Sequence, residues 1–500
     1  MNTRNSVSCL GLILALSSLS SQNLFSQESK TLQIGSWVTY HDRSALFEKQ
    51  SDTLIFSNFN KGWGTTIVID DRQEFQGIDG FGFALTGGSA GLIMRMSPGS
   101  RRALLQELFS EKGKSIGVSY LRISIGASDL NDFVFSYDDL PDGETDFDLK
   151  NFSLGQDLKD VVPVLKEILA LSPDIKILGS PWSAPRWMKT NNNVRSGSLR
   201  KDCYDVYARY FVKYILAMKK EGIVIDAITI QNEPLNSKNT PSMRWVVSEQ
   251  TSFIRDYIGP AFKKAGIMTK IILFDHNCDR PDYPLALLND PELAKYVDGS
   301  GFHHYGGDLS AMSVVHLARP DKNIYFTEQM VTENPGSSTI EIADPVIRLI
   351  IGAPRNWSRN VILWNLAADP LDDPHTDNGG CSMCQGAVTI DGDKVTRNIA
   401  FFTIAHASRF VRPGSVRIAS TNTGDNTISL TMDEEQPGIY RATVIENTQV
   451  FPNVAFRTPE GRIVLIVAND TGSADSFNIQ YRGQFATVEL KPGAVGTYVW

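Results

Sequence analysis

The stretch Asp226-Ala-Ile-Thr-Ile-Gln-Asn-Glu-Pro234 is a short run of apolar and β-branched residues that ends in an amide, a carboxylate and a proline. Comparable runs recur between residues 77 and 410 and alternate with longer amphipathic stretches. Eight strands, each followed by a helix or a long loop, predict an α/β protein built on a (β/α)8 TIM barrel. The strands are expected at Asp79–Leu85, Val118–Ile125, Ile175–Ser180, Asp226–Gln231, Lys270–Asp275, Val297–His303, Asn323–Thr327 and Asn360–Trp364.

The intervening amphipathic stretches predict the helices of the barrel. They have the 3.6-residue spacing of apolar positions that places one face of a helix against a core. The helices are expected at Pro98–Lys112, Leu158–Leu171, Tyr204–Lys220, Thr240–Ala265 and Ala343–Ala353.

The two flanks of the barrel have a different pattern. Residues 411–500 contain short alternating runs separated by Gly, Pro, Asn and Asp, which indicate an all-β domain. Residues 27–76 also contain strand-like runs, at Leu54–Phe56 and Thr65–Ile69. We therefore expect a β-sandwich attached to the barrel and built from both the N-terminal and the C-terminal strands.

Composition excludes several classes of protein. Hydrophobic residues make up 42% and charged residues 21% of the 500-residue chain, which suits a globular protein with a large core. The formal charge is −8, from 48 basic and 56 acidic residues, so no basic surplus favours nucleic acid as a partner.

Residues 1–26 have the pattern of a secretory signal peptide. Arg4 supplies the positive charge, and the apolar core that follows is too short to span a bilayer. No later run predicts a membrane helix, so we expect a secreted or periplasmic protein without an integral membrane segment.

Four cysteines follow the predicted signal peptide, too few for a disulfide scaffold. Cys203 and Cys278 are expected to be buried thiols. Cys381 and Cys384 have the spacing of a zinc knuckle and lie near His375, but a second pair is missing. A local disulfide, free thiols and a structural metal remain open for this pair.

The ends of two predicted strands place carboxylates where barrel enzymes have their active sites. The fourth strand ends in Asn232-Glu233-Pro234, and the seventh ends in Thr327-Glu328-Gln329. A single Glu at such a position could form a structural ion pair. Two of them, on strands on roughly opposite sides of one ring, can flank one bond. Retaining glycoside hydrolysis needs such a pair about 5–5.5 Å apart, one as nucleophile and one as acid/base.

Other strand ends agree with a sugar site. Arg122 on the second strand is expected to hold Glu328 ionised, and Asp129 beyond that strand could bind two adjacent hydroxyls. Trp182 and Trp364 offer rings for stacking on a sugar, although a tryptophan can equally serve in core packing.

The sixth strand ends in His303-His304-Tyr305, and His276 follows the fifth strand. These histidines lack the spacing of a metal motif, so we expect them to contact hydroxyl groups and expect neither a metal nor a cofactor.

These residues together resemble glycoside hydrolase family 30, most closely its glucosylceramidase branch. The matching motifs are Asp79-Gly-Phe-Gly82, Ser180-Pro-Trp-Ser-Ala-Pro-Arg-Trp187, Tyr207-Ala-Arg-Tyr-Phe-Val-Lys213, Asn232-Glu-Pro234 and Trp364-Asn-Leu366. The resemblance implies a barrel with a sandwich built from both termini, Glu233 as acid/base and Glu328 as nucleophile. It further implies Arg122 beside the nucleophile, and a sugar subsite lined by Asp129, Trp182, Asn232, His304, Tyr305 and Trp364.

Two residues depart from that branch, because His304 and Leu130 stand where the human-type enzyme has Trp and Phe. The Cys381–Cys384 insertion is more similar to bacterial members. We expect a secreted retaining β-glycosidase of the glucosylceramidase or β-glucosidase type that acts on a carbohydrate or glycolipid. An endo-β-1,6-glucanase, or a β-xylosidase or β-fucosidase on the same scaffold, is the alternative. A non-catalytic glycan-binding protein is the remote alternative, which would be marked by loss of either Glu.

Overall fold

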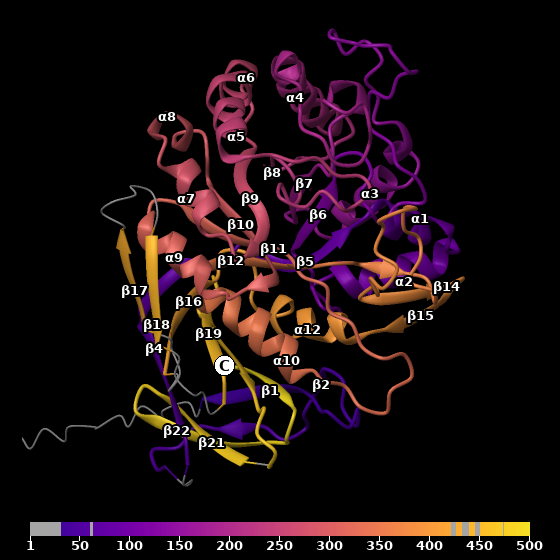
Figure 1. Cartoon of the computed structure of the whole chain (residues 1–500). Helices are drawn as coiled ribbons and strands as arrows, with labels where there is room; N and C mark the ends of the chain where they lie inside the picture. Colours follow the sequence, from indigo (N-terminus) through magenta and orange to yellow (C-terminus); the bar gives the residue numbers. More distant parts are fainter. Residues whose placement is uncertain (1–31, 61–63, 422–426, 433–439, 446–450, 474) are drawn as a thin grey trace, which may run out of the picture.

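The computed structural model describes residues 32–60, 64–421, 427–432, 440–445, 451–473 and 475–500. The predicted signal peptide lies outside these residues. Figure 1 shows a barrel surrounded by helices and, below it, a second body of strands from both ends of the chain. None of the described helices has the length and apolarity that a bilayer crossing needs.

Eight parallel strands form the predicted closed barrel, in the order β10-β11-β12-β5-β6-β7-β8-β9. Each lies where the sequence predicts one, with shifts of at most four residues at the ends. Their bounds are β5 (Gly80–Leu85), β6 (Tyr120–Ser124), β7 (Lys176–Ser180), β8 (Ala227–Thr229), β9 (Lys270–Cys278), β10 (Gly299–Gly307), β11 (Asn323–Glu328) and β12 (Ser358–Leu363).

Apolar side chains fill the interior of the barrel near the beginning of its strands. A cluster from six strands occupies this level, with Tyr120 and Tyr325 as its largest members. The barrel is therefore packed with side chains at one end, and a polar site can form only at the other, where the strands end.

The helices cover the outside of the barrel and largely match the prediction. They are α1 (Gly87–Arg95), α2 (Pro98–Phe109), α3 (Val161–Leu171), α4 (Tyr204–Lys220), α5 (Val247–Phe253), α6 (Gly259–Ala265), α7 (Asp282–Leu288), α8 (Pro291–Ala294), α9 (Ser310–Ala318), α10 (Ala343–Pro345), α11 (Ala353–Arg355) and α12 (Ile399–Ser408). Short 3-10 turns are η1 (Gly155–Leu158), η2 (Arg186–Met188) and η3 (Lys201–Cys203), and π-helical segments are η4 (Ile254–Ile258) and η5 (Val346–Gly352).

The helix predicted from Thr240 begins only at Val247. The chain before Val247 has no regular secondary structure, and its apolar side chains Met243 and Trp245 are buried there without a helix. Helices α5 and α6 are continuous through η4, so the rest of the prediction to Ala265 is correct.

The second body is a ten-stranded sheet made from both ends of the chain, as predicted. Its order is β2-β1-β23-β20-β19-β16-β4-β21-β22, with β3 paired to β1. A bridge between Ser57 and Phe485 links the region after β3 to β22, so the strands wrap around one apolar core. The strands are β1 (Gln33–Thr39), β2 (Glu48–Lys49), β3 (Leu54–Ile55), β4 (Thr66–Gly77), β16 (Val416–Ser420), β19 (Asn453–Arg457), β20 (Ile463–Ala468), β21 (Asp475–Tyr481), β22 (Gln484–Leu490) and β23 (Val495–Val499).

Two strands expected in this body, β17 (Thr427–Met432) and β18 (Tyr440–Ile445), pair with each other and form a separate two-stranded sheet. Helix α12 lies between the two bodies, and all of its residues are buried. Its His406 hydrogen-bonds Thr39 and Thr497, which lie at opposite ends of the chain. The barrel and the terminal strands are therefore joined through a buried contact.

A third, three-stranded sheet lies in the segment between the last barrel strand and α12. It consists of β13 (Ala367–Ala368), β14 (Val388–Asp391) and β15 (Lys394–Arg397). The chain between β13 and β14 contains Cys381 and Cys384, which form a disulfide. Cys203 and Cys278 are buried free thiols, as predicted.

Candidate active site

The two predicted carboxylates meet at the end of the barrel. Glu328 is the last residue of β11, and Glu233 follows β8 in the loop toward α5. Both side chains are about 6% exposed. One oxygen of each carboxylate and one nitrogen of His303 lie within 4.8 Å of one another. The structure therefore brings Glu233 and Glu328 into one buried cluster.

Arg122 on β6 lies at the centre of this cluster and is fully buried. Its guanidinium donates hydrogen bonds to Glu328, to Asp275 Oδ2 at 2.8 Å and to Asn232 Oδ1 at 2.7 Å. A buried cation needs such partners, because removal from water costs several kcal/mol per ion. Arg122 thus fixes the nucleophile candidate and the asparagine next to Glu233 in one network.

Asp275, which the sequence did not indicate, and His303, which it indicated only as a partner for hydroxyl groups, belong to this network. His303 binds Asp275 Oδ1 through Nε2 at 2.9 Å and Glu233 Oε1 through Nδ1 at 3.3 Å. Burial lowers the pKa of His303, but the nearby carboxylates outweigh it and raise this pKa to about 9. The charges of Arg122 and His303 hold the pKa of Asp275 well below its ordinary value despite burial.

Backbone geometry explains how Asp275 reaches the centre. Strand β9 pairs with β10 through Phe274 and then through His276, so Asp275 is an extra residue in the ladder. Phe274 and Asp275 have φ angles of 69° and 60°, and Glu233, whose N–H donates to the Asp275 carbonyl at 2.9 Å, has 48°. Left-handed conformations of this kind are costly for residues other than glycine and cluster at functional sites.

The electrostatic balance of the two glutamates differs from the sequence expectation. Burial raises the pKa of Glu233, but the hydrogen bond and charge of His303 lower it to about 2. Burial also raises the pKa of Glu328. The charges of His303 and Arg122 lower it by less than burial raises it, so this pKa stays above its ordinary value. Arg122 therefore contacts Glu328 as predicted without holding it at a low pKa in the free protein. Glu233 is therefore the stronger acid of the two carboxyls in the free protein.

Asp129 lies in the loop after β6 and is 6% exposed. Burial, together with the charges of Glu328 and Glu233, raises its pKa to about 8. Its Oδ1 is buried without a hydrogen-bond partner, and so is the indole nitrogen of Trp182. These atoms are free to bind hydroxyl groups of a ligand.

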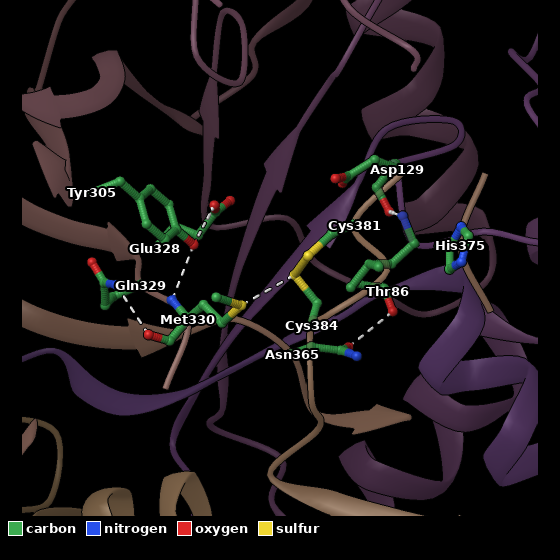
Figure 2. The surroundings of a disulfide bond; sticks show 12 residues. Thr86, Asp129, Tyr305, Glu328, Gln329, Met330, Asn365, His375, Cys381 and Cys384 are labelled. Carbon is green, nitrogen blue, oxygen red and sulfur yellow. Dashed lines mark hydrogen bonds between the residues drawn. A yellow bond between two sulfur atoms is a disulfide. The ribbon is translucent and has the colours of Figure 1, made fainter. Parts of the chain in front are cut away.

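Trp182 and Trp364 form the wall beside these groups. Their rings are stacked with centroids 5.3 Å apart, and the Arg122 guanidinium lies 4.9 Å from the Trp182 ring. Tyr305, 42% exposed, donates its hydroxyl to Glu328 Oε1 at 3.0 Å. Figure 2 shows Tyr305 and Glu328 on one side and Asp129 on the other.

His304 is the one predicted site residue that the structure does not bring into the cluster. The charged groups that act on its pKa are Arg348, Asp308 and Asp344, not the two glutamates. Because successive side chains of a strand point to opposite faces, His303 and Tyr305 turn toward the glutamates and His304 turns away. Its Nδ1 is buried without a partner, and its role in substrate binding stays a prediction.

Glu233, His303 and Glu328 could supply metal-ligand atoms within 4.8 Å of one another, but these groups already have other partners. Both His303 nitrogens already contact carboxylates, and the guanidinium of Arg122 contacts Glu328. A second cation would be repelled there. These contacts favour a site without metal, which stays a prediction.

A TIM barrel with two close carboxylates and a tryptophan wall at the ends of its strands defines a glycoside hydrolase. The family model described as "Glycosyl hydrolase family 30 TIM-barrel domain" matches residues 78–411, and that of the family's β-sandwich domain matches residues 414–498. The chain belongs to glycoside hydrolase family 30 and is a β-glycosidase. This confirms the resemblance and the two-domain fold that the sequence predicted.

Several relatives show which activities occur near this chain. The endo-1,6-β-D-glucanase neg1 of Aspergillus fumigatus is 36% identical over 77% of this chain and 81% of its own length. The lysosomal acid glucosylceramidase of Mus musculus is 27% identical over 88% of this chain and 84% of its own length. The putative glucosylceramidase 3 of Caenorhabditis elegans is also 27% identical, and both alignments span 467 residues. The solved structure of the endo-β1,6-glucanase BT3312 is 31% identical, covers 94% of this chain and 99% of its own, and has a TM-score of 0.80.

Proposed function

We propose that this β-glycosidase is an endo-acting hydrolase of β-1,6-linked glucan that works with retention of configuration. The spacing of the glutamates carries the proposal of retention. Their nearest oxygens lie within 4.8 Å, which suits the separation of about 5–5.5 Å in retaining enzymes. Inverting enzymes place the two groups about 6.5–9.5 Å apart to hold a water molecule between them.

In the proposed reaction Glu328 attacks the anomeric carbon while Glu233 protonates the leaving oxygen. A water molecule then gives its proton to Glu233 and releases the sugar from Glu328. Arg122 and Tyr305, which both donate to Glu328, orient the attacking carboxylate. The first step needs a proton on Glu233, so binding of the sugar must raise the pKa of Glu233 relative to that of Glu328.

The sugar itself is expected to contact the groups around the pair. Asn232 is held by Arg122 next to Glu233, where the family resemblance places the sugar 2-hydroxyl. Asp129 and Trp182 supply the unpaired polar atoms for other hydroxyls, and the Trp364 ring lies beside them. A neutral Asp129 can donate as well as accept a hydrogen bond.

The choice of β-1,6-glucan rests on the relatives. Proteins named endo-1,6-β-glucanases are 31–36% identical to this chain, whereas those named glucosylceramidases are 27–28% identical. These values favour the glucanase, the sequence alternative, over the glucosylceramidase type that the motifs suggested first. The predicted signal peptide further supports action outside the cytoplasm, where polymeric glucan is encountered.

A substrate panel tests this proposal. Purified protein is incubated with pustulan, β-1,3-glucan, an aryl β-glucoside and glucosylceramide in detergent, and products are separated by length. We expect pustulan to yield a ladder of oligosaccharides and the other substrates to react at least tenfold more slowly. Preferential hydrolysis of glucosylceramide, or release of glucose alone from pustulan, would refute the endo-glucanase assignment.

A further inference from the structure

The Cys381–Cys384 disulfide lies against the wall of the active site. Cys384 is 3% exposed and belongs to a cluster of apolar side chains with Trp182 and Trp364. Met330 and Cys381 pack against the same cluster. The disulfide therefore packs in the same apolar cluster as the two tryptophan rings, although it comes from a loop far along the chain from either catalytic strand.

Hydrogen bonds hold the chain on both sides of the disulfide. The N–H of Thr376 donates to the carbonyl of Asp129 at 2.9 Å, and the N–H of Ala387 donates to the carbonyl of Asn365 at 2.8 Å. A Cβ on Gly380 would lie 2.9 Å from that Asp129 carbonyl, so the loop packs tightly there. Between these anchors the disulfide closes the remaining turn of the loop.

A series of contacts leads from the disulfide to the proposed nucleophile, as Figure 2 shows. Cys384 Sγ lies 3.4 Å from Met330 Sδ. The backbone N–H of Met330 donates to the Tyr305 hydroxyl at 3.0 Å, and this hydroxyl donates to Glu328 Oε1 at 3.0 Å. A shift of the loop would thus be transmitted to the residue that orients Glu328.

We propose that Cys381 and Cys384 are positioning residues, and that their disulfide sets the catalytic geometry of the wall formed by Trp182 and Trp364 and of Tyr305. This inference rests on the proposed glycosidase reaction. Reduction by dithiothreitol transfers two electrons and two protons to the sulfurs, giving two thiols while the reagent closes to a cyclic disulfide. The unlinked loop then no longer holds the Cys384 sulfur against the side chain of Met330, so hydrolysis becomes sensitive to reduction.

Activity with and without dithiothreitol tests the proposal. Cys203 and Cys278 are already free thiols, so among the described residues the reagent has only this bond to break. We expect kcat/KM on the best substrate of the panel to fall about tenfold, because small displacements of positioning groups are costly to catalysis. Mass spectrometry after alkylation reports the extent of reduction.

The Cys381→Ser/Cys384→Ser variant is the matched control. It should have the low kcat/KM of the reduced wild type and should not respond to dithiothreitol. Unchanged circular dichroism would show that the variant is folded. If the variant does not fold, the wild type still supplies the test. Its activity should fall on reduction and return in full on reoxidation.

A double-mutant cycle with Tyr305→Phe separates positioning from general stability. Because the disulfide acts through Met330 and Tyr305, its loss should cost less than about threefold once the tyrosine hydroxyl is absent. Equal losses in both backgrounds would overturn the proposal, and so would full activity of the reduced or the serine protein. Failure of the oxidised wild type on every substrate would instead refute the proposed function.

Discussion

Replacement of Asp129 by Asn tests the electrostatics of the active site through stability. Asp129 is 6% exposed, and burial beside two glutamates raises its pKa from 3.8 to about 8. The unfolded chain loses this proton near pH 4, whereas the folded chain keeps it to about pH 8. Folding therefore takes up a proton in this range, and the stability contributed by this group falls as pH rises.

The magnitude follows from the size of the shift. Each pH unit between the two pKa values changes the free energy of unfolding by about 1.4 kcal/mol. From pH 4.5 to pH 7.5 the wild type should thus lose about 4 kcal/mol through Asp129 alone. Asn resembles the protonated carboxyl in shape and does not titrate, so the Asp129→Asn variant should be spared this loss.

Urea unfolding of both proteins at pH 4.5 and pH 7.5 measures the effect. The free energy of unfolding of the variant minus that of the wild type should be about 4 kcal/mol more positive at pH 7.5 than at pH 4.5. An Asp129→Ala variant should gain similar stability but bind substrate worse, because it lacks the hydrogen-bonding group. The same difference at both pH values would show that Asp129 is ionised in the folded protein and would refute the reasoning.

Three further predictions concern catalysis. Glu328→Ala and Glu233→Ala should each lower turnover by roughly 10⁴-fold. Added azide should restore activity and give glucosyl azides of opposite configuration, the α anomer with Glu328→Ala and the β anomer with Glu233→Ala. Identical anomers would contradict the assigned roles. His303→Gln should move the alkaline limb of the kcat/KM profile upward in pH, because it removes the cation that lowers the pKa of Glu233; an unmoved limb would exclude this role. Trp364→Ala should raise KM on glucan by about tenfold or more, because it removes the ring that packs against Trp182 beside the two glutamates. Trp357→Ala, which lies outside this apolar cluster, is the comparison.

The sequence predicted the barrel well because each strand is a short apolar run between helices. It also predicted that Glu233 and Glu328 lie together at the ends of their strands, since both follow such runs directly. The closure of the chain by β1 and β23 could be expected from the all-β character of both flanks. The separate pairing of β17 with β18 could not be expected from the sequence. The alternation of apolar and polar residues indicates strands but does not indicate which strands pair.

The central network was only partly predictable. Asp275 reaches Arg122 through an extra residue in β9, and no pattern in the sequence indicates that irregularity. The alternation of side chains along a strand could have shown which of His303 and His304 faces the site. Residues two apart share a face, so His303 lies on the same face as Tyr305. The low pKa of Glu233 depends on His303, and the partition of a proton within a buried cluster depends on distances that the sequence does not contain.

The configuration of the first product tests the central claim most directly. Pustulan digestion is followed by proton NMR from the first minutes, before the sugar ring opens and the anomers equilibrate. The close pair of Glu233 and Glu328 predicts that new reducing ends appear first as the β anomer and convert slowly to the α anomer. Initial appearance of the α anomer would show inversion and would contradict the account of these two carboxylates.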